Sequence, residues 1–326
     1  MPDEALVFGS IAMDYIMSVF PTLREELPMK DGKIDTINIA IVASDVTILP
    51  GGTAGNICFG IGFLGGKATI HSVVGYDFMQ TYGKRLLNHN IDLAIKIMPE
   101  YQTAHAYMIS DKHNEQIILW VPNAIKFIDE LDFEEKILAK KNNFKLSIFA
   151  PGTAISTLRG MKNTQQLNPN IKKIFDPGQM VLTYEKEQFL ECITLADIII
   201  MNDTEWLKTK NFGISLSSLH HEYPQKILIE TLGAKGSVFY LPTYSFEVGI
   251  ASPDKTVEVT GAGDAFRSGL IKGLLDDLSW EESAKLGASL ASLCIECRGG
   301  QGYEIFPKEK AYERAKNVAV KRIQND

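Results

Sequence analysis

Short apolar segments recur along the chain, and longer segments whose apolar residues have helical spacing lie between them. The short segments predict β-strands at 5–9, 68–74, 145–150, 171–176, 197–201, 226–231, 236–241 and 244–249. The longer segments predict α-helices at 53–64, 77–89, 153–161, 185–195, 203–209, 264–276, 280–297 and 308–322. The alternation predicts an α/β fold: a doubly wound, mainly parallel sheet with helices on both faces.

Two regions depart from this alternation, because they predict strands with no helix between them. These strands are expected at 34–42, 46–49, 101–110 and 115–121. The segment Asp111-Lys112-His113-Asn114 suits the turn of a hairpin between the last two. We expect the four strands to form a small β-sheet lid, inserted as segments of about 15–50 and 99–125. No internal repeat or low-complexity linker interrupts the sequence, so we expect a single domain over 1–326.

Composition narrows the class of partners. The chain has 326 residues, of which 45% are hydrophobic, and a formal net charge of −7. The negative charge argues against a general role on nucleic acid or on a membrane surface. No apolar run approaches the roughly 20 residues of a membrane span, and the start Met1-Pro2-Asp3-Glu4 is unlike a signal peptide. We therefore expect a cytoplasmic protein that acts on small molecules.

The four cysteines, Cys58, Cys192, Cys294 and Cys297, show no paired pattern. We expect free thiols in a reducing compartment. Cys294 and Cys297 form a single C-x-x-C in a helical, Ala-rich stretch, and the absence of a second pair argues against a zinc site.

Candidate chemistry centres on Gly261-Ala262-Gly263-Asp264, where a loop turns into a helix. The three small residues let a ligand approach the backbone, and the free N–H groups and dipole of a helix start favour an anion. Asp264 would repel a phosphate there unless it served as a general base for a substrate hydroxyl during phosphoryl transfer. The alternative is an ordinary helix start with an aspartate near it.

A second group of candidates lies near the N-terminus. Asp14 follows the first predicted strand, at the sheet edge where ligands of α/β proteins bind, and could accept hydrogen bonds from two sugar hydroxyls. A turn-forming aspartate is the alternative. Gly51 and Gly52 precede a helix whose first turn carries Asn56. The later G-x-G-x-x-G at 60–65 lies inside that helix and precedes a strand, so it marks a helix end and no dinucleotide site.

Two further segments suit a nucleotide and its metal. Asn202 ends a predicted strand and Glu205 falls in the first turn of the next helix, where a carboxylate could hold Mg²⁺ through water. A capping box is the alternative explanation. Thr231-Leu232-Gly233-Ala234-Lys235-Gly236 is a strand–turn–strand segment whose glycines could admit an adenine or a phosphate, although any tight turn uses glycine too.

These segments, in this order, resemble the ribokinase-like (PfkB) carbohydrate and nucleoside kinases over nearly the whole chain. The first signature is Gly51-Gly52 with Asn56, and the second is Thr260-Gly261-Ala262-Gly263-Asp264-Ala265-Phe266 with Gly269. Asn202-x-x-Glu205 and the segment from Thr231 to Gly236 match the magnesium-related and ATP-binding segments of that family.

The resemblance implies a ribokinase-like fold and an ATP-dependent kinase that phosphorylates an alcohol. It implies catalytic roles for Asp264, Gly261, Ala262 and Gly263, and substrate contacts from Asp14, Gly51, Gly52 and Asn56. It implies ATP contacts from Asn202, Thr231, Gly233, Gly236, Thr260, Gly261 and Gly263, and a water-mediated Mg²⁺ contact from Glu205.

Within that family the chain looks most similar to the nucleoside (adenosine-type) kinases of bacteria and archaea. Arg267 after the aromatic residue, the hairpin Ser110–Ile117 and the entry Val19-Phe20-Pro21 carry this similarity. After the hairpin, Pro122-Asn123-Ala124-Ile125 stands where those relatives have Pro-Gly-Ala-Met. We therefore expect transfer of the ATP γ-phosphate to the 5′-hydroxyl of a nucleoside such as adenosine. A sugar kinase for ribose or fructose is the alternative. A binding protein without chemistry is disfavoured because Asp264 and Gly-Ala-Gly are intact.

The resemblance also implies ATP and Mg²⁺ as cofactors. It leaves K⁺ open, because Glu258-Val259-Thr260 replaces the usual Asp-Thr-Thr. Tyr15, Phe20 and Trp120 are candidates to contact a nucleobase, with packing of the lid as the alternative for each. The sequence leaves open whether the protein is a monomer or a homodimer through the lid.

Overall fold

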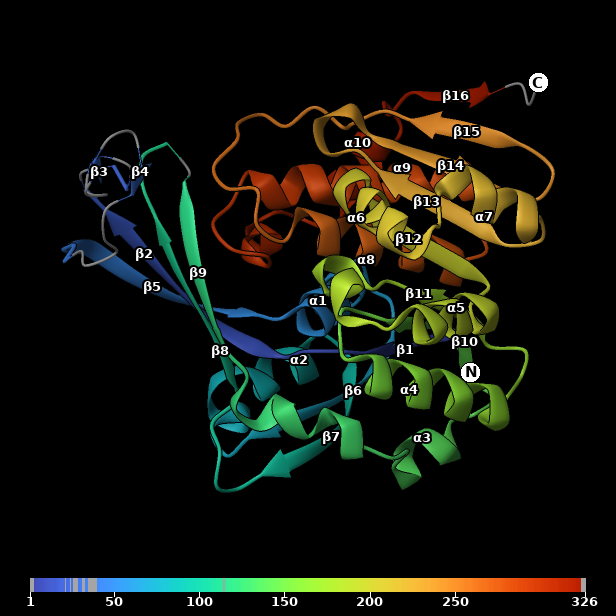
Figure 1. Cartoon of the computed structure of the whole chain (residues 1–326), viewed down its shortest axis with the longest axis horizontal. Coiled ribbons are helices and arrows are strands. Elements are labelled where there is room, and N and C mark those ends of the chain that lie inside the picture. Colours follow the sequence, from blue (N-terminus) through green and yellow to red (C-terminus); the bar gives the residue numbers. More distant parts are fainter. Residues whose placement is uncertain are drawn as a thin grey trace.

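A ten-stranded sheet forms the centre of the protein, in a computed structural model that describes residues 3–20, 22–23, 25, 29–30, 33–34, 40–113 and 115–323 (Figure 1). Its strand order is β16 (Val320–Ile323), β15 (Ser245–Val248), β14 (Ser237–Tyr240), β13 (Ile227–Thr231), β12 (Ile198–Asn202), β11 (Lys172–Phe175), β10 (Phe144–Phe149), β1 (Glu4–Phe8), β6 (Ala68–Gly75) and β7 (Ile91–Met98). Neighbours from β13 to β7 pair in parallel, and those from β13 to β16 pair antiparallel.

The central strands are apolar because helices cover both of their faces. In β1, Val7 lies level with Ile148 of β10 and with Ile70 of β6, and all three side chains are buried. Because these strands are parallel and in this register, they end together, and the loops after β1 and β10 share one edge of the sheet.

Helices lie on opposite faces of the sheet (Figure 1). One face carries α1 (Thr53–Phe63), α2 (Lys84–Asn88), α8 (Ala262–Leu275), α9 (Trp280–Ile295) and α10 (Glu309–Ala315). The other carries α3 (Glu135–Ala139), α4 (Ala154–Leu167), α5 (Lys186–Leu195), α6 (Asp203–Lys208) and α7 (Leu216–Glu222). Short 3₁₀ or π segments are η1 (Met79–Gly83), η2 (Asn123–Glu130), η3 (Gly178–Thr183), η4 (Thr209–Phe212), η5 (Gly233–Lys235) and η6 (Gly302–Ile305).

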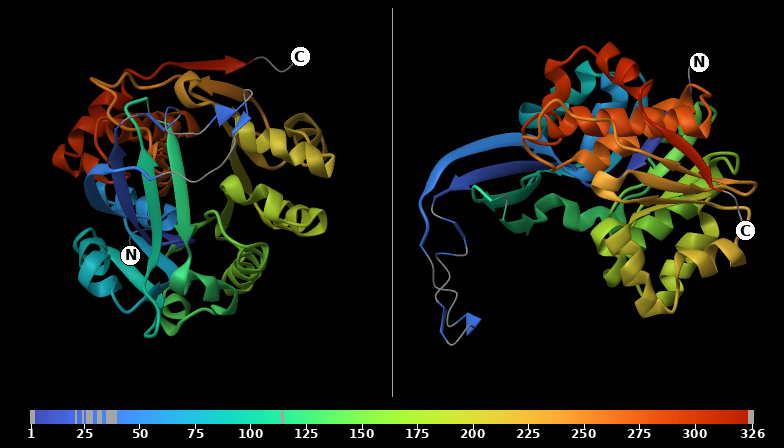
Figure 2. Two further views of the ribbon diagram at one scale, coloured as in Figure 1. Left: turned by 60° about the vertical axis from the view of Figure 1, so that its left-hand side comes forward. Right: turned by 90° about the horizontal axis from the view of Figure 1, so that it is seen from above.

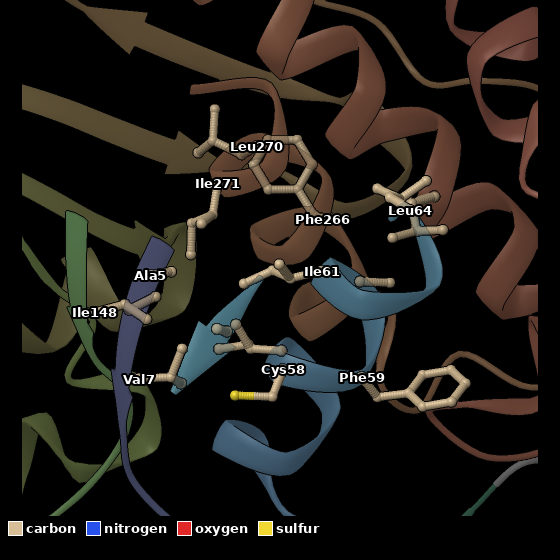
Figure 3. Packing of buried hydrophobic residues seen from close by; sticks show 14 of the residues in the cluster. Ala5, Val7, Cys58, Phe59, Ile61, Leu64, Ile148, Phe266, Leu270 and Ile271 are labelled. Carbon is tan, nitrogen blue, oxygen red and sulfur yellow. The ribbon is translucent and has the colours of Figure 1, made fainter. Parts of the chain in front are cut away.

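The helix α8 is held against one face of the sheet by the largest hydrophobic core. Its residues Phe266, Leu270 and Ile271 pack near α1 and β1 (Figure 3). Burying a side chain of this size stabilises the fold by about 1.5–3 kcal/mol. Gly269 allows close contact with α9, because a Cβ there would lie 2.6 Å from the backbone oxygen of Leu286. This packing fixes where the first turn of α8 points.

A separate four-stranded sheet projects from one side of the large sheet (Figure 2). Its order is β5 (Ala43–Gly51), β2 (Ala12–Val19), β8 (Ala104–Ser110) and β9 (Gln116–Val121). We call it the lid sheet. A two-stranded sheet of β3 (Met29–Lys30) and β4 (Lys33–Ile34) lies apart from it. The strands β8 and β9 form the predicted hairpin, although Asn114 of its predicted turn lies outside the described residues. Asp111 accepts hydrogen bonds from the backbone N–H groups of His113 and Glu115 in the hairpin and from that of Leu23.

The fold agrees with the predicted ribokinase-like α/β arrangement, with several local differences. The short helices α3 and α7 were not predicted. The strand β2 was not predicted, and it is a central strand of the lid sheet. The strand predicted at 34–42 lies mostly outside the described residues. The strand β7 was also missed, although its apolar residues alternate. The helix predicted at 77–89 is interrupted by η1.

The helix predicted at 308–322 is wrong beyond α10, because the chain turns and pairs as β16 with β15. Pairing with an exposed sheet edge outweighs a weak local helix preference.

All four cysteines are buried free thiols. Among the described residues, no helix combines the length and apolar character needed to cross a membrane.

Candidate active site

A cavity of about 620 Å³ opens where β1 and β10 end, between the large sheet and the lid sheet. Its polar lining includes Asp14, Asn56, Thr260, Gly261 and Asp264, which come from separate parts of the sequence. Much of its remaining lining is apolar: Phe8, Ala106, Met108, Ile118, Trp120, Ile125, Ile128, Leu131, Phe133, Phe149 and Met180. The fold therefore joins a small group of carboxyl and amide side chains to a larger apolar surface.

Asp264 lies in the first turn of α8 and faces this cavity. The helix begins after Gly261, whose φ of 80° is in the left-handed region. A Cβ on Gly261 would lie 2.4 Å from the Cα of Gly300, so both the backbone angle and the space require glycine. The N–H of Ala262 donates to the backbone oxygen of Val259 at 3.3 Å, whereas the N–H groups of Gly263 and Asp264 have no partner within the helix and can bind an anion. The arrangement places a carboxylate and an anion site side by side.

Burial raises the pKa of Asp264 from 3.8 to about 6. The hydrogen bond from Asn56 and the positive charge of Arg267 oppose this rise, and the negative charge of Asp176 adds to it. A carboxylate with a pKa near 6 is ionised at neutral pH yet basic enough to accept a proton, which suits a general base.

A buried ion pair, which was not predicted from the sequence, lies beside the first turn of α8. Arg267 donates to both carboxylate oxygens of Asp176, with 2.7 Å between its NH2 nitrogen and Oδ1, and both side chains are buried. Arg267 also donates to the backbone oxygen of Gly263 at 3.1 Å. Because Asp176 balances the charge of Arg267, the pair serves mainly to hold the first turn of α8 in place through the bond to Gly263.

Asp14 faces the cavity from β2 and is 5% exposed. Burial raises its pKa from 3.8 to about 7, and the nearby charges of Asp264 and Glu258 add to the rise. A Cβ on Gly51, its neighbour on β5, would lie 2.1 Å from Asp14 Oδ2, so glycine is required for this side-chain position. Two carboxylates of raised pKa thus share one cavity, a pattern common at functional sites.

The loop before α1 folds tightly against the end of β1. Gly52 has a φ of 79°, and a Cβ there would lie 2.7 Å from the backbone oxygen of Ser10. That oxygen accepts a hydrogen bond from the backbone N–H of Ala54 at 3.1 Å. Gly52 lines the cavity, as its predicted substrate contact requires.

Asn56 also lines the cavity, but its side chain is bonded to protein groups. Its Nδ2 donates to Asp264 Oδ2 at 2.8 Å, and its Oδ1 accepts from Gln301 Nε2 at 2.9 Å. The amide retains a second N–H and a second lone pair for a ligand.

The predicted nucleotide segments lie along the same sheet edge, outside the cavity lining. Asn202 and Glu205 form the capping box that was the alternative prediction, with two reciprocal bonds of 2.8 Å. The Glu205 carboxyl is buried, and burial raises its pKa. No group of three potential metal ligands occurs in the described part of the chain.

The turn from Thr231 to Gly236 joins β13 to β14. Gly233 has a φ of 57°, and a Cβ there would meet no described atom within 4 Å, so its backbone is open to a ligand. Gly236 has a structural reason to be glycine, because a Cβ there would lie 2.0 Å from the backbone oxygen of Val248.

The three aromatic candidates for base contact lie in different environments. Trp120 lines the cavity from β9. Tyr15 stacks on Tyr107 with 4.9 Å between ring centroids, on the opposite face of the lid sheet from Asp14. Phe20 is 63% exposed and does not line the cavity. Of the three, Trp120 alone is positioned beside the candidate site.

The family model for pfkB family carbohydrate kinases matches residues 30–305. The chain belongs to this family. A curated nucleoside kinase from Methanocaldococcus jannaschii is 30% identical over 298 residues, which cover 90% of each chain. This membership makes the protein an ATP-dependent kinase that phosphorylates a hydroxyl group.

Solved structures agree with the family assignment. A crystal structure of a Methanocaldococcus jannaschii nucleoside kinase, an archaeal member of the ribokinase family, has a TM-score of 0.82 at 28% identity and covers 96% of this chain and 98% of its own. A Burkholderia thailandensis nucleoside kinase in complex with inosine has a TM-score of 0.82 at 25% identity, covering 96% and 97%. The predicted family, its nucleoside-kinase branch and the fold are confirmed.

Proposed function

We propose that this pfkB-family kinase is a nucleoside kinase that transfers the γ-phosphoryl group of ATP to the 5′-hydroxyl of a nucleoside such as adenosine. The observation that carries the proposal is the apolar extension of the cavity beyond Asp14 and Asp264. A volume of about 620 Å³ is in the range of sites for drug-sized molecules. A monosaccharide would leave the apolar surface in contact with water, whereas a nucleobase would cover it.

The base would lie against Trp120 and the aromatic side chains at the ends of β1 and β10. Phe8 stacks on Phe149 with ring centroids 4.4 Å apart, and both line the cavity. Aromatic and apolar walls favour a flat heterocycle through stacking and burial. The two nucleoside kinases named above support this assignment.

The ribose would lie among Asp14, the backbone of Gly51 and Gly52, and Asn56. An ionised carboxylate accepts hydrogen bonds and donates none, so Asp14 can bind the 2′- and 3′-hydroxyls together. These hydroxyl donors favour the ionised form of Asp14, whose pKa is about 7 in the free protein. Nucleoside binding should therefore strengthen as pH rises through 7.

The transfer step requires a base and an anion site. The oxygen of the 5′-hydroxyl attacks the γ-phosphorus while Asp264 takes the hydroxyl proton. The bond from the γ-phosphorus to the bridging oxygen breaks, and ADP leaves. The backbone N–H groups of Gly261 and Gly263 and the start of α8 stabilise the negative charge on the transferred group, and the N–H of Ala262 would join them on release from the Val259 oxygen.

ATP would extend from Thr260 toward Asn202 and the turn that contains Thr231, Gly233 and Gly236. Mg²⁺ neutralises phosphate charge when it is bound, and Glu205 would hold it through a water molecule. A single carboxylate that acts through water suits Mg²⁺, because this ion usually keeps several of its own water ligands.

A monovalent cation such as K⁺ fits beside Glu258. The Oε1 atom of this residue is buried and has no hydrogen-bond partner among the described residues, while Oε2 accepts from the backbone N–H of Gly299 at 3.1 Å. A buried carboxylate oxygen that accepts no hydrogen bond is costly by itself, and a cation beside it would offset that cost. Equal activity with K⁺ and with tetramethylammonium as the sole monovalent cation would remove this part of the proposal.

The lid sheet would close over the nucleoside and exclude water, which limits ATP hydrolysis. The outer face of the lid sheet carries exposed Ile48 and Leu119 and suits contact with a second copy, so the protein is proposed to act as a monomer or as a homodimer through the lid. Its free thiols favour the cytoplasm.

The test is a kinase assay that measures ADP release with adenosine, inosine, cytidine, ribose and fructose as acceptors. Wild type and Trp120→Ala are compared, with Leu207→Ala as a matched control because Leu207 is an exposed apolar residue outside the cavity. We expect nucleosides to be the best acceptors, and Trp120→Ala to raise KM for nucleosides about tenfold. Turnover of ribose or fructose but of no nucleoside would establish a sugar kinase instead.

A further inference from the structure

A row of hydrogen-bonded side chains runs from Arg85 on α2 to Asp264 on α8. Arg85 Nε donates to Gln301 Oε1 at 3.0 Å, and Gln301 Nε2 donates to Asn56 Oδ1 at 2.9 Å. Asn56 Nδ2 donates to Asp264 Oδ2 at 2.8 Å. We call these four residues the Arg85–Asp264 row. Every bond in it points in the same direction, toward the carboxylate.

The direction is set at Arg85, because a guanidinium has donors and no acceptor. Arg85 is fixed in place by two further contacts. Its NH2 nitrogen lies 2.7 Å from Glu304 Oε2, and its guanidinium lies 4.5 Å from the centroid of the Phe59 ring. Only the oxygen of the Gln301 amide can face this donor.

The amide nitrogen of Gln301 must therefore face the other way. It donates to Asn56 Oδ1 and to the hydroxyl of Tyr82. Gln301 is 3% exposed, so water cannot readily replace these partners. Turning its amide over would place a nitrogen against Arg85 and an oxygen against Asn56 Oδ1, which leaves buried groups unpaired.

The same reasoning fixes the amide of Asn56. Its oxygen is occupied by Gln301, so its nitrogen faces Asp264. The reverse orientation would direct a carbonyl oxygen at the carboxylate, and the two would repel. Asp264 Oδ2 is thereby occupied, while Oδ1 has no hydrogen-bond donor among the described residues and remains for the acceptor hydroxyl.

Two glycines allow the row to close. A Cβ on Gly300 would lie 2.7 Å from Asn56 Nδ2, and a Cβ on Gly55 would lie 2.5 Å from the hydroxyl oxygen of Tyr82. A larger residue at either position would displace a member or a partner of the row. Glycine at both positions is therefore required for these hydrogen bonds to form.

We propose that Gln301, oriented by Arg85, is a positioning residue for phosphoryl transfer: it fixes the Asn56 amide so that Asn56 donates to Asp264 and leaves one carboxylate oxygen free for the acceptor proton. The inference rests on the proposed function in one respect, that Asp264 is the general base. It holds for a nucleoside or a sugar acceptor alike.

Several other groups act on Asp264 and must stay constant in a test. The positive charge of Arg267, on the same helix, lowers the pKa of Asp264, and the negative charge of Asp176 raises it. The carboxylate of Asp14 faces the same cavity from the lid sheet, with Glu258 close to it. Cys294 and Tyr303 interact with Asp264 but stay neutral, because burial raises the pKa of each well above its usual value. None of these groups belongs to the row.

The experiment compares the pH profiles of kcat for wild type, Gln301→Met, Gln301→Glu and Arg85→Met at saturating ATP and acceptor. Both Gln301→Met and Arg85→Met release the Asn56 amide that donates to Asp264, and loss of this donor raises the pKa of Asp264. The acid limb of the profile, where kcat falls as Asp264 becomes protonated, should therefore move to higher pH by about 1. The kcat defect is then roughly fivefold at pH 6 and below about twofold at pH 8.5. Gln301→Glu offers only acceptors, turns the Asn56 amide over and should move the acid limb further in the same direction.

Tyr312→Phe is the matched control, because its hydroxyl donates to the backbone oxygen of Leu64 at 3.2 Å, away from the row. Its acid limb should coincide with that of wild type. A loss of kcat that is equal at every pH in Gln301→Met and Arg85→Met would overturn the proposal and leave Gln301 with a packing role. Arg85 is partly exposed, so Arg85→Met carries the test if Gln301→Met does not fold.

The Asp264→Asn variant separates failure of this inference from failure of the proposed function. If Asp264→Asn keeps the wild-type kcat, Asp264 is not the base and both ideas fail. If Asp264→Asn is inactive while the acid limb of both row variants stays at the wild-type pH, only the role of Gln301 is wrong.

Discussion

Replacing Asp264 with asparagine should abolish most activity and make the protein more stable at alkaline pH. The substitution keeps the size of the side chain and an oxygen that can accept from Asn56, but it removes the base. A lost general base lowers kcat by on the order of 10²-fold or more, while nucleoside binding should be retained.

The stability effect follows from the pKa of Asp264. The folded-state pKa of about 6 lies above the ordinary value of 3.8, so the folded protein favours the neutral carboxyl. That stabilisation is fully present below pH 3.8 and is lost as pH rises through 6. Each tenfold change in the acid dissociation constant corresponds to about 1.4 kcal/mol. The rise in pKa from 3.8 to about 6 therefore means that ionised Asp264 costs on the order of 3 kcal/mol of folding free energy at pH 8. Asp264→Asn removes this cost.

The assay is thermal unfolding of wild type and Asp264→Asn at pH 8 and pH 5, together with kcat. A gain of about 3 kcal/mol should raise Tm by roughly 5 °C at pH 8, and about half of the gain should remain at pH 5. Asp132→Asn is a control, since its side chain is 79% exposed and should change neither quantity. The reasoning is refuted if Asp264→Asn retains near-normal kcat, or if it lowers Tm equally at both pH values.

Three further predictions concern the acceptor, the metal and the anion site. Since Asp14 has a pKa of about 7 and should bind both ribose hydroxyls, kcat/KM should fall as pH drops below 7, and 2′-deoxyadenosine should be at least about tenfold poorer than adenosine. Equal kcat/KM for the two nucleosides would show that Asp14 does not contact the 2′-hydroxyl. Glu205→Gln should raise the Mg²⁺ concentration needed for half-maximal activity, and an unchanged magnesium titration would leave Glu205 with its capping role alone. Gly261→Ala forces a Cβ to 2.4 Å from the Cα of Gly300 at a φ of 80°, so it should destabilise the fold by at least about 1–3 kcal/mol and abolish activity; wild-type Tm and kcat would contradict the expected clash.

Local patterns in the sequence predicted most strands of the large sheet, most helices and the start of α8. Gly261, Gly263 and Asp264 lie within four residues, so their small size and charge could be interpreted before the fold was known. The strand β2 was missed because its stability depends on pairing with β5 and β8 on both sides, which a local pattern does not reveal.

The support around Asp264 could not be predicted for the same physical reason. Asp176 and Arg267 are 91 residues apart, and Asn56 and Gln301 are 245 residues apart. Pairs this distant share no periodicity, and a buried glutamine has no local signature. Asp176 had a partial signal, since Asp176-Pro177-Gly178 ends a predicted strand at the ligand-binding edge.

The most direct test of the nucleoside-kinase proposal is identification of the product formed from ATP and adenosine by phosphorus NMR. The proposal predicts adenosine 5′-monophosphate and ADP in equal amounts from wild type, and neither product above background from Asp264→Asn. Formation of ADP only when ribose or fructose replaces adenosine would contradict the proposal.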